Sequence, residues 1–88
     1  MKTFSDLEFK THPSGEGVQA LIYFDNGYGA SVVRTPFSYG GDRGKYELAI
    51  YHEGSICYDT HITNDVIGYL TEDEVTDFLR QIQELEKE

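Results

Sequence analysis

The sequence predicts one α+β domain: an antiparallel sheet of four to five strands with one C-terminal amphipathic helix packed on one face. Three observations support this fold class. β-rich segments separated by glycine turns fill the first two thirds of the chain, and an amphipathic helical pattern follows them. The chain has 88 residues, enough for one modest core. We therefore treat residues 1–88 as a single small domain.

The first clear element is a β-hairpin over residues 18–35, with its turn at Asn26-Gly27. Asn-Gly favours a two-residue type I′ turn, because both central residues of that turn need positive φ. Such a turn places Tyr23 and Tyr28 diagonally on one face of the hairpin. The other face is purely apolar on its first strand, so we place it against the core and expect both tyrosines to face solvent. The predicted core face consists of Val18, Ala20, Ile22, Phe24, Val33 and Thr35.

A second hairpin is predicted from residues 45–52 and 55–62, with its turn at residues 53–54. A short leading strand over about residues 7–12 is expected to join the sheet. Between the hairpins, residues 37–44 contain three glycines and two aromatic residues, which predicts a mobile loop with exposed aromatic groups. These elements together give the four to five strands of the expected sheet.

The C-terminal helix has the best-defined boundary in the chain. Residues 66–70 are short and apolar, and we predict a packed turn or a single helical turn there. Thr71 and Glu74 then form a capping-box pattern, in which each side chain accepts a hydrogen bond from the other residue's backbone N–H. The helix is predicted to run to about Glu86. One apolar stripe recurs at helical spacing and consists of Val75, Phe78, Leu79, Ile82 and Leu85.

Acidity is the strongest functional signal in the sequence. Sixteen Asp and Glu oppose seven Lys and Arg, which gives a formal net charge of -9, and eight of the acids lie between Asp65 and Glu88. Such a field repels nucleic acid and attracts basic surfaces. No apolar stretch approaches the roughly 20 residues that a membrane helix needs. The single cysteine, Cys57, permits no internal disulfide, so we expect a reducing cytoplasmic location without membrane contact.

No residue pattern favours catalysis, a metal site or a cofactor site. The three histidines are His12, His52 and His61; the second hairpin is expected to keep His52 and His61 far apart along its strands, and Cys57 has no CxxC partner. Cys57 and His61 lie four residues apart, which is about 13 Å on a strand and too far for a nucleophile and its base unless the strand ends between them. The glycine cluster at residues 39–44 lacks the spacing of a phosphate-binding loop. We therefore expect no catalytic residue, no metal and no cofactor, and a protein that is not an enzyme.

Residues 26–34 (NGYGASVVR), the loop at residues 38–41 (SYGG) and the segments 58–60 and 65–71 resemble a family of small tailed-phage accessory proteins. The resemblance covers about residues 8–85 and lies in the texture and order of these segments. It implies a phage early or accessory protein made in a bacterial host cytoplasm. Short acidic proteins of that kind are often inhibitors of host machinery, and by this analogy the chain is anti-CRISPR-like.

These observations favour a small acidic phage-type protein that inhibits a bacterial host-defence or nucleic-acid-binding complex by protein–protein contact. The expected partner is a bacterial protein or ribonucleoprotein complex with a basic surface. Tyrosines are expected to anchor the complex, because tyrosine is enriched at protein interfaces, and acids of the helix are expected to steer association. The predicted partner-binding residues are Tyr23, Tyr28, Tyr39, Glu72, Asp73, Asp77 and Glu84.

Two other functions remain open at this point. In the first, residues 38–44 and neighbouring tyrosines form a pocket for a small molecule or nucleotide, and Arg34 or Arg43 binds an anion. In the second, the protein is a structural virion accessory protein. A homodimer is compatible with each of these functions.

Overall fold

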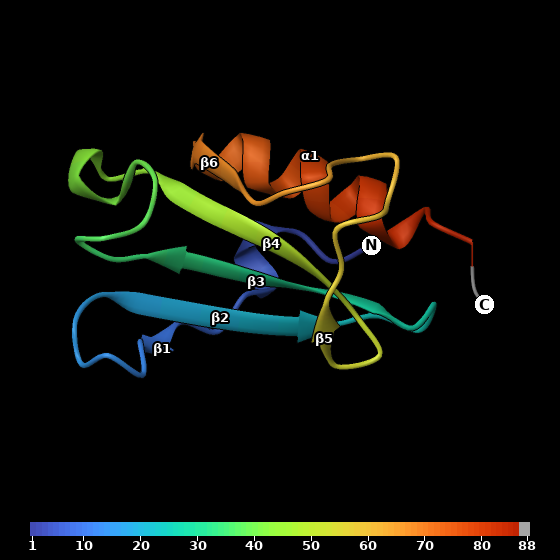
Figure 1. Cartoon of the computed structure of the whole chain (residues 1–88), viewed down its shortest axis with the longest axis horizontal. Helices are drawn as coiled ribbons and strands as arrows, with labels where there is room; N and C mark the ends of the chain where they lie inside the picture. The colour runs from blue at the N-terminus through green and yellow to red at the C-terminus, as the bar shows by residue number, and fades with distance from the viewer. Residues whose placement is uncertain (87–88) are drawn as a thin grey trace.

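The computed structural model describes residues 1–86, which form one antiparallel sheet and one α-helix (Figure 1). Strands β1 to β4 are neighbours in chain order, and β5 and β6 share the outer edge of β4. The predicted α+β class, with the helix on one face of the sheet, is confirmed. The elements are η1 (Phe4–Asp6), β1 (Lys10–Thr11), β2 (Val18–Tyr23), β3 (Tyr28–Arg34), η2 (Gly41–Arg43), β4 (Tyr46–His52), β5 (Ser55–Ile56), β6 (Ile67–Leu70) and α1 (Glu72–Gln83).

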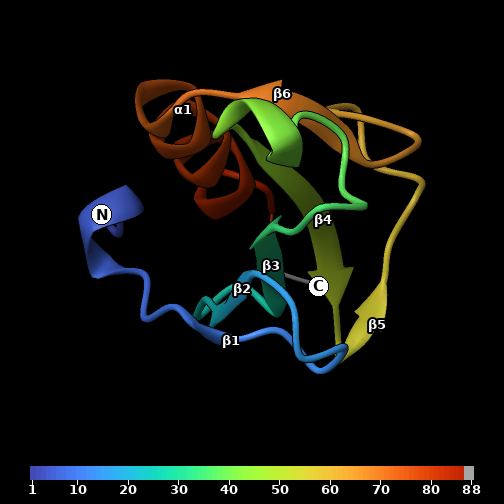
Figure 2. The same cartoon turned by 90° about the vertical axis from the view of Figure 1, so that its left-hand side faces the viewer.

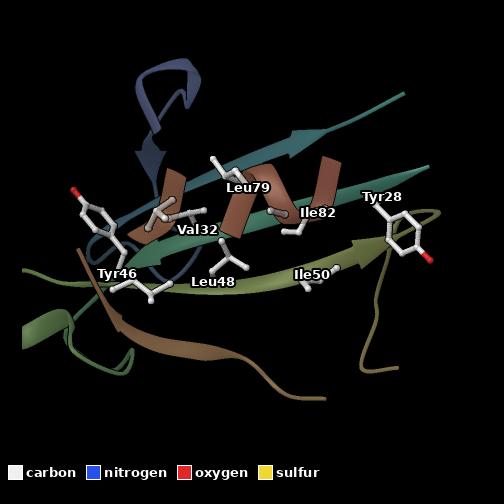
Figure 3. Packing of buried hydrophobic residues seen from close by; sticks show 10 residues of the cluster. Tyr28, Val32, Tyr46, Leu48, Ile50, Leu79 and Ile82 are labelled. Carbon is white, nitrogen blue, oxygen red and sulfur yellow. The ribbon is translucent and has the colours of Figure 1, made fainter. Parts of the chain in front are cut away.

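The core lies between the sheet and α1 (Figure 3). Val32 of β3, and Leu48 and Ile50 of β4, meet Leu79 and Ile82 of α1, and all five side chains are almost completely buried. The predicted helical stripe is confirmed, since three of its five residues are buried and the other two pack against the core. Burial of this stripe fixes which side of α1 faces solvent.

The first hairpin forms where predicted, but its register differs by one residue. The N–H of Phe24 donates to the C=O of Tyr28 at 2.8 Å, so the loop contains three residues rather than two. The third loop residue, Gly27, has φ of 87°, as expected for the left-handed position that closes such a loop. Tyr23 therefore pairs with Gly29.

This register moves the side chains of β3 to the opposite face. Tyr28 points into the core and is 8% exposed, whereas Tyr23 faces solvent and is 56% exposed. Val33, predicted for the core, lies on the outer face with Glu47 beside it. The prediction that Tyr28 faces solvent beside Tyr23 is wrong, because one extra loop residue reverses the alternation of the second strand.

The side chain of Asn26 accounts for the three-residue loop. Its Nδ2 donates to the carbonyl oxygens of Ile82 at 2.9 Å and of Leu85 at 3.1 Å, and its Oδ1 accepts from the N–H of Tyr28 at 3.0 Å. The last carbonyls of a helix have no partner inside the helix, so Asn26 satisfies groups that α1 leaves open. A contact with the distant helix thus selects the shape of the turn.

The second hairpin differs from the prediction at its far end. The turn at residues 53–54 forms as predicted, but β5 ends at Ile56. The prediction of a turn at residues 66–70 is wrong, because this segment supplies β6, which pairs Leu70 with Tyr46 of β4. Periodicity does not distinguish a strand from a helical turn in so short an apolar run, and the open edge of β4 decides the outcome.

The capping box at the start of α1 is confirmed. The N–H of Glu74 donates to Thr71 Oγ1 at 3.2 Å, and the N–H of Thr71 donates to Glu74 Oε1 at 3.0 Å. Replacing Thr71 by Ala should lower the free energy of unfolding by about 1 kcal/mol, measured by urea denaturation. Thr71→Ser keeps the hydroxyl and should stay near the wild type. A Ser variant as unstable as the Ala variant would contradict the capping role.

The same box makes stability depend on pH. The hydrogen bond from the backbone N–H of Thr71 lowers the pKa of the Glu74 carboxyl below its usual value of 4.5. A pKa lowered by folding stabilises the folded state above the unfolded pKa, and this contribution is lost as pH falls through the folded pKa. The stability difference between wild type and Glu74→Gln should therefore shrink below about pH 4. Urea denaturation at several pH values would measure it, and a constant difference would contradict it.

Candidate functional site

The seven predicted partner-binding residues do not form one surface. Tyr39, Glu72 and Asp73 lie near the end of the molecule that holds η2, β6 and the start of α1, on the left of Figure 1. Tyr23 is the last residue of β2 and Glu84 caps the far end of α1, so both lie near the other end. Tyr28 is in the core, and Asp77 lies on the solvent side of α1.

Arg80 pairs with some of the acids of α1 but not with those of its first turn. Its guanidinium pairs with Asp77 through Nη2 and with Glu84 through Nη1, the latter at 3.1 Å. The hydrogen bond that Arg80 donates to the Asp77 carboxylate raises the pKa of Arg80 above its usual value, so the cation persists. Within residues 1–86, Glu72 and Asp73 form no ion pair. The negative charges of Glu72 and Asp73, in the first turn of the helix, are therefore not balanced by an ion pair within these residues.

The loop that carries Tyr39 lies directly against β6, and Figure 2 shows the two segments side by side. The N–H of Tyr69 donates to the C=O of Tyr39 at 3.1 Å. Glycine is required at both contact points, because a Cβ on Gly68 would lie 2.4 Å from the Cβ of Tyr39, and one on Gly40 would lie 2.9 Å from the Cα of Tyr69. The N–H of Tyr39 also donates to Glu47 Oε2 at 3.4 Å. These contacts fix two tyrosines beside each other.

Sequence reasoning missed Tyr69. Between the pairs that join β4 and β6 the register shifts, so that Gly68 and Tyr69 both lie opposite Glu47 in a β-bulge. Tyr69 has φ of 58°, a left-handed conformation that is unusual for a bulky residue, yet its side chain is 54% exposed. Nothing in the local sequence indicates this conformation, since it depends on the pairing of β6 with β4.

We name this region the aromatic–acidic surface. Its aromatic side chains include Tyr39, which is 61% exposed, and the largely exposed Phe37, two residues earlier on the same loop. The start of α1 follows β6 after a single residue, which brings the first helical turn to the same end of the molecule. The name refers to six residues at this end of the molecule, which are Phe37, Tyr39, Glu47, Tyr69, Glu72 and Asp73.

The strain at Tyr69 can be measured by comparing two truncations. A left-handed conformation costs a residue with a Cβ about 1–2 kcal/mol and costs glycine little. Tyr69→Gly should therefore be more stable than Tyr69→Ala by about 1 kcal/mol in urea denaturation. Leu21, in the extended strand β2, is the matched control, and there the Ala variant should be the more stable of the pair. The same order of stability at both sites would contradict strain at Tyr69.

Two clefts lie away from the aromatic–acidic surface. The larger, about 520 Å³, lies near the β2–β3 turn, where Tyr23, Asn26 and Gln83 contribute to its wall. The smaller, about 270 Å³, lies beside β1. Residues 38–44 line neither cleft, and the guanidinium of Arg34 lies over the ring of Tyr46, 5.3 Å from its centroid. The anion pocket predicted at this loop therefore has no counterpart in these two clefts.

Residues 1–86 contain no group of three or more His, Cys, Asp and Glu side chains placed to hold a metal ion. In the same residues, no helix combines the length and the apolar character needed to cross a membrane. Comparison of the chain with protein-family models, with curated proteins and with solved structures gave no match. The candidate site is therefore assigned from its geometry and charge.

Proposed function

We propose that this protein is a small acidic phage-type inhibitor that binds a bacterial host-defence or nucleic-acid-binding complex by protein–protein contact. The supporting observation is the aromatic–acidic surface, where two fixed and exposed tyrosines lie at the same end as Glu72 and Asp73, which form no ion pair within residues 1–86. A CRISPR effector in the bacterial host cytoplasm is the sharpest candidate target, since such complexes carry basic surfaces for nucleic acid.

Charge and aromatic groups have separate tasks in this proposal. The net charge of -9 attracts a basic partner over distance and raises the rate of association. Large aromatic side chains then anchor the complex, because they bury much area while few rotatable bonds are fixed. Of the expected anchors Tyr23, Tyr28 and Tyr39, only Tyr39 is retained, and Tyr69 joins it, since Tyr28 is buried and Tyr23 lies at the other end of the sheet.

Capture from bacterial lysate tests the proposal. The tagged protein should retain a nucleic-acid-binding complex in washes at about 50 mM salt and release it at about 500 mM, because salt screens exposed charge pairs. A variant with Tyr39→Ala and Tyr69→Ala should lose the complex, whereas Tyr23→Ala, the removal of an equally exposed tyrosine, should keep it. The captured complex should also lose its ability to bind nucleic acid when this protein is bound to it. Capture that is unchanged in the double variant, or that leaves the complex active, would overturn the proposal.

A pair of charge variants tests the steering role. Glu72→Gln with Asp73→Asn removes two acids from the aromatic–acidic surface, and association with the captured partner should slow about tenfold at low salt. Glu16→Gln with Asp25→Asn removes the same charge from exposed positions elsewhere and serves as the control. Equal association rates for the two variants would show that local charge at α1 has no steering role.

A further inference from the structure

We infer that the aromatic–acidic surface recognises arginine side chains of its partner, with Tyr39 and Tyr69 contacting the guanidinium plane and Glu47 accepting its hydrogen bonds. The inference rests on the proposed function, because it names the chemistry of the partner at that same surface. A guanidinium is planar, stacks on aromatic faces and donates to carboxylates in a fixed geometry. An exposed tyrosine pair with a carboxylate beside it complements each of these properties.

Tyr39 and Tyr69 are neighbours in the fold although they lie far apart in the sequence. The backbones of Tyr39 and Tyr69 are joined by the 3.1 Å hydrogen bond, and both side chains are more than half exposed. Within residues 1–86 neither ring packs face to face or edge to face against another aromatic ring. One side of each tyrosine lies toward a glycine, Tyr39 toward Gly68 and Tyr69 toward Gly40, and the exposed part of each side chain is available to a ligand from outside the chain.

Glu47 supplies the acceptor. It lies on β4, opposite the bulge that contains Tyr69, and is partly buried. Its Oε2 accepts the N–H of Tyr39 at 3.4 Å, while a carboxylate offers about four acceptor positions. Within residues 1–86 Glu47 forms no ion pair, so it retains the capacity to accept from a guanidinium.

Two cations of the loop that carries Tyr39 form no ion pair with this surface within residues 1–86. Arg43 and Lys45 follow Tyr39 on the same loop, and both are exposed. Lys45 acts electrostatically on Glu74, and neither cation forms an ion pair within residues 1–86. Glu72 and Asp73 therefore keep their charge available to a basic partner.

The surface is also formed before binding. The glycine contacts at positions 40 and 68 lock the loop to β6, and the left-handed backbone of Tyr69 holds its ring outward. Rings that are already positioned lose little conformational freedom on binding, which favours affinity.

Binding of two peptides of equal length and charge, one carrying arginines and one carrying lysines, tests the inference at low salt. The arginine peptide should bind about tenfold more tightly, because the planar guanidinium can stack on a ring and donate in parallel to a carboxylate, whereas the lysine ammonium cannot. Tyr39→Ala, Tyr69→Ala and Glu47→Gln should each reduce this preference, and Tyr23→Ala should not. NMR titration of the unaltered protein should shift the amides of Tyr39 and Tyr69 rather than those of β2, which keeps the test valid if a variant folds poorly.

The outcomes separate this inference from the proposed function. Equal affinity for the two peptides, or shifts centred on β2, would overturn arginine recognition even if a bacterial complex is captured. A clear arginine preference at Tyr39 and Tyr69 without any captured complex would support arginine recognition and overturn the proposed function alone.

Discussion

Replacing Leu79 by Ala is expected to lower the free energy of unfolding by about 3 kcal/mol, the typical cost of a cavity at a fully buried leucine. Leu79 is 0% exposed and lies between α1 and the centre of the sheet. A domain of this size has only about 5–10 kcal/mol of stability in total. The melting temperature should therefore fall by roughly 15 °C, at about 4–8 °C for each kcal/mol.

Leu21→Ala is the matched control for this variant. It removes the same atoms from a side chain on the outer face of β2 that is half exposed. Its effect should stay below about 1 kcal/mol, because less apolar area returns to water and no closed cavity forms. Calorimetry and urea denaturation measure both variants. Similar losses for Leu79→Ala and Leu21→Ala would contradict the assignment of the core to the α1 side of the sheet.

Replacing Asn26 by Asp is expected to lower the free energy of unfolding by about 2–3 kcal/mol although the two side chains have nearly the same shape. The change removes the donor that satisfies the carbonyls of Ile82 and Leu85. It also places a negative charge at the C-terminal end of α1, where the helix dipole is negative. The lost hydrogen bonds and the added charge repulsion therefore both destabilise the Asn26→Asp variant relative to the wild type.

Asn64→Asp is the control, since Asn64 is exposed in the loop before β6 and its replacement should change stability by less than about 0.5 kcal/mol. The loss in Asn26→Asp should also diminish as pH falls below about 4, where protonation removes the charge from the new carboxyl. Urea denaturation at neutral and acid pH measures both effects. Equal stability of the two variants would show that the link from the turn to α1 has little energetic weight.

Local signals predicted the parts of the fold that depend on local interactions. The capping box at Thr71 and Glu74 involves residues three apart, and the apolar stripe of α1 follows from helical spacing, so both could be read from the sequence. The register of the first hairpin could not, because Asn26 reaches across to the end of the helix 56 residues later. The strand β6 likewise depends on the open edge of β4 rather than on its own four residues.

In the candidate site, too, local patterns predicted some residues, whereas others depend on contacts between distant segments. Exposure of Tyr39 and the acids Glu72 and Asp73 follows from loop and capping patterns, and these three residues do lie at the same end of the molecule. The predicted exposure of Tyr28 was inferred from a two-residue turn, and this prediction is wrong because the loop has three residues. Tyr69 belongs to a bulge between β4 and β6, which residues 53–66 separate in the chain, and only the register of that pairing re-aims its side chain.

The contact between Asn26 and the helix end also affects the deamidation of Asn26. An Asn-Gly sequence loses its side-chain amide readily, because the glycine nitrogen attacks the side-chain carbonyl carbon and ammonia departs. Here the departing nitrogen is held by the carbonyls of Ile82 and Leu85, and the N–H of Gly27 is bonded to the C=O of Phe24 at 3.3 Å. Deamidation must therefore wait until the turn separates from α1. The first aspartate formed would then loosen the same contact, so chemical damage and unfolding of this small domain accelerate each other.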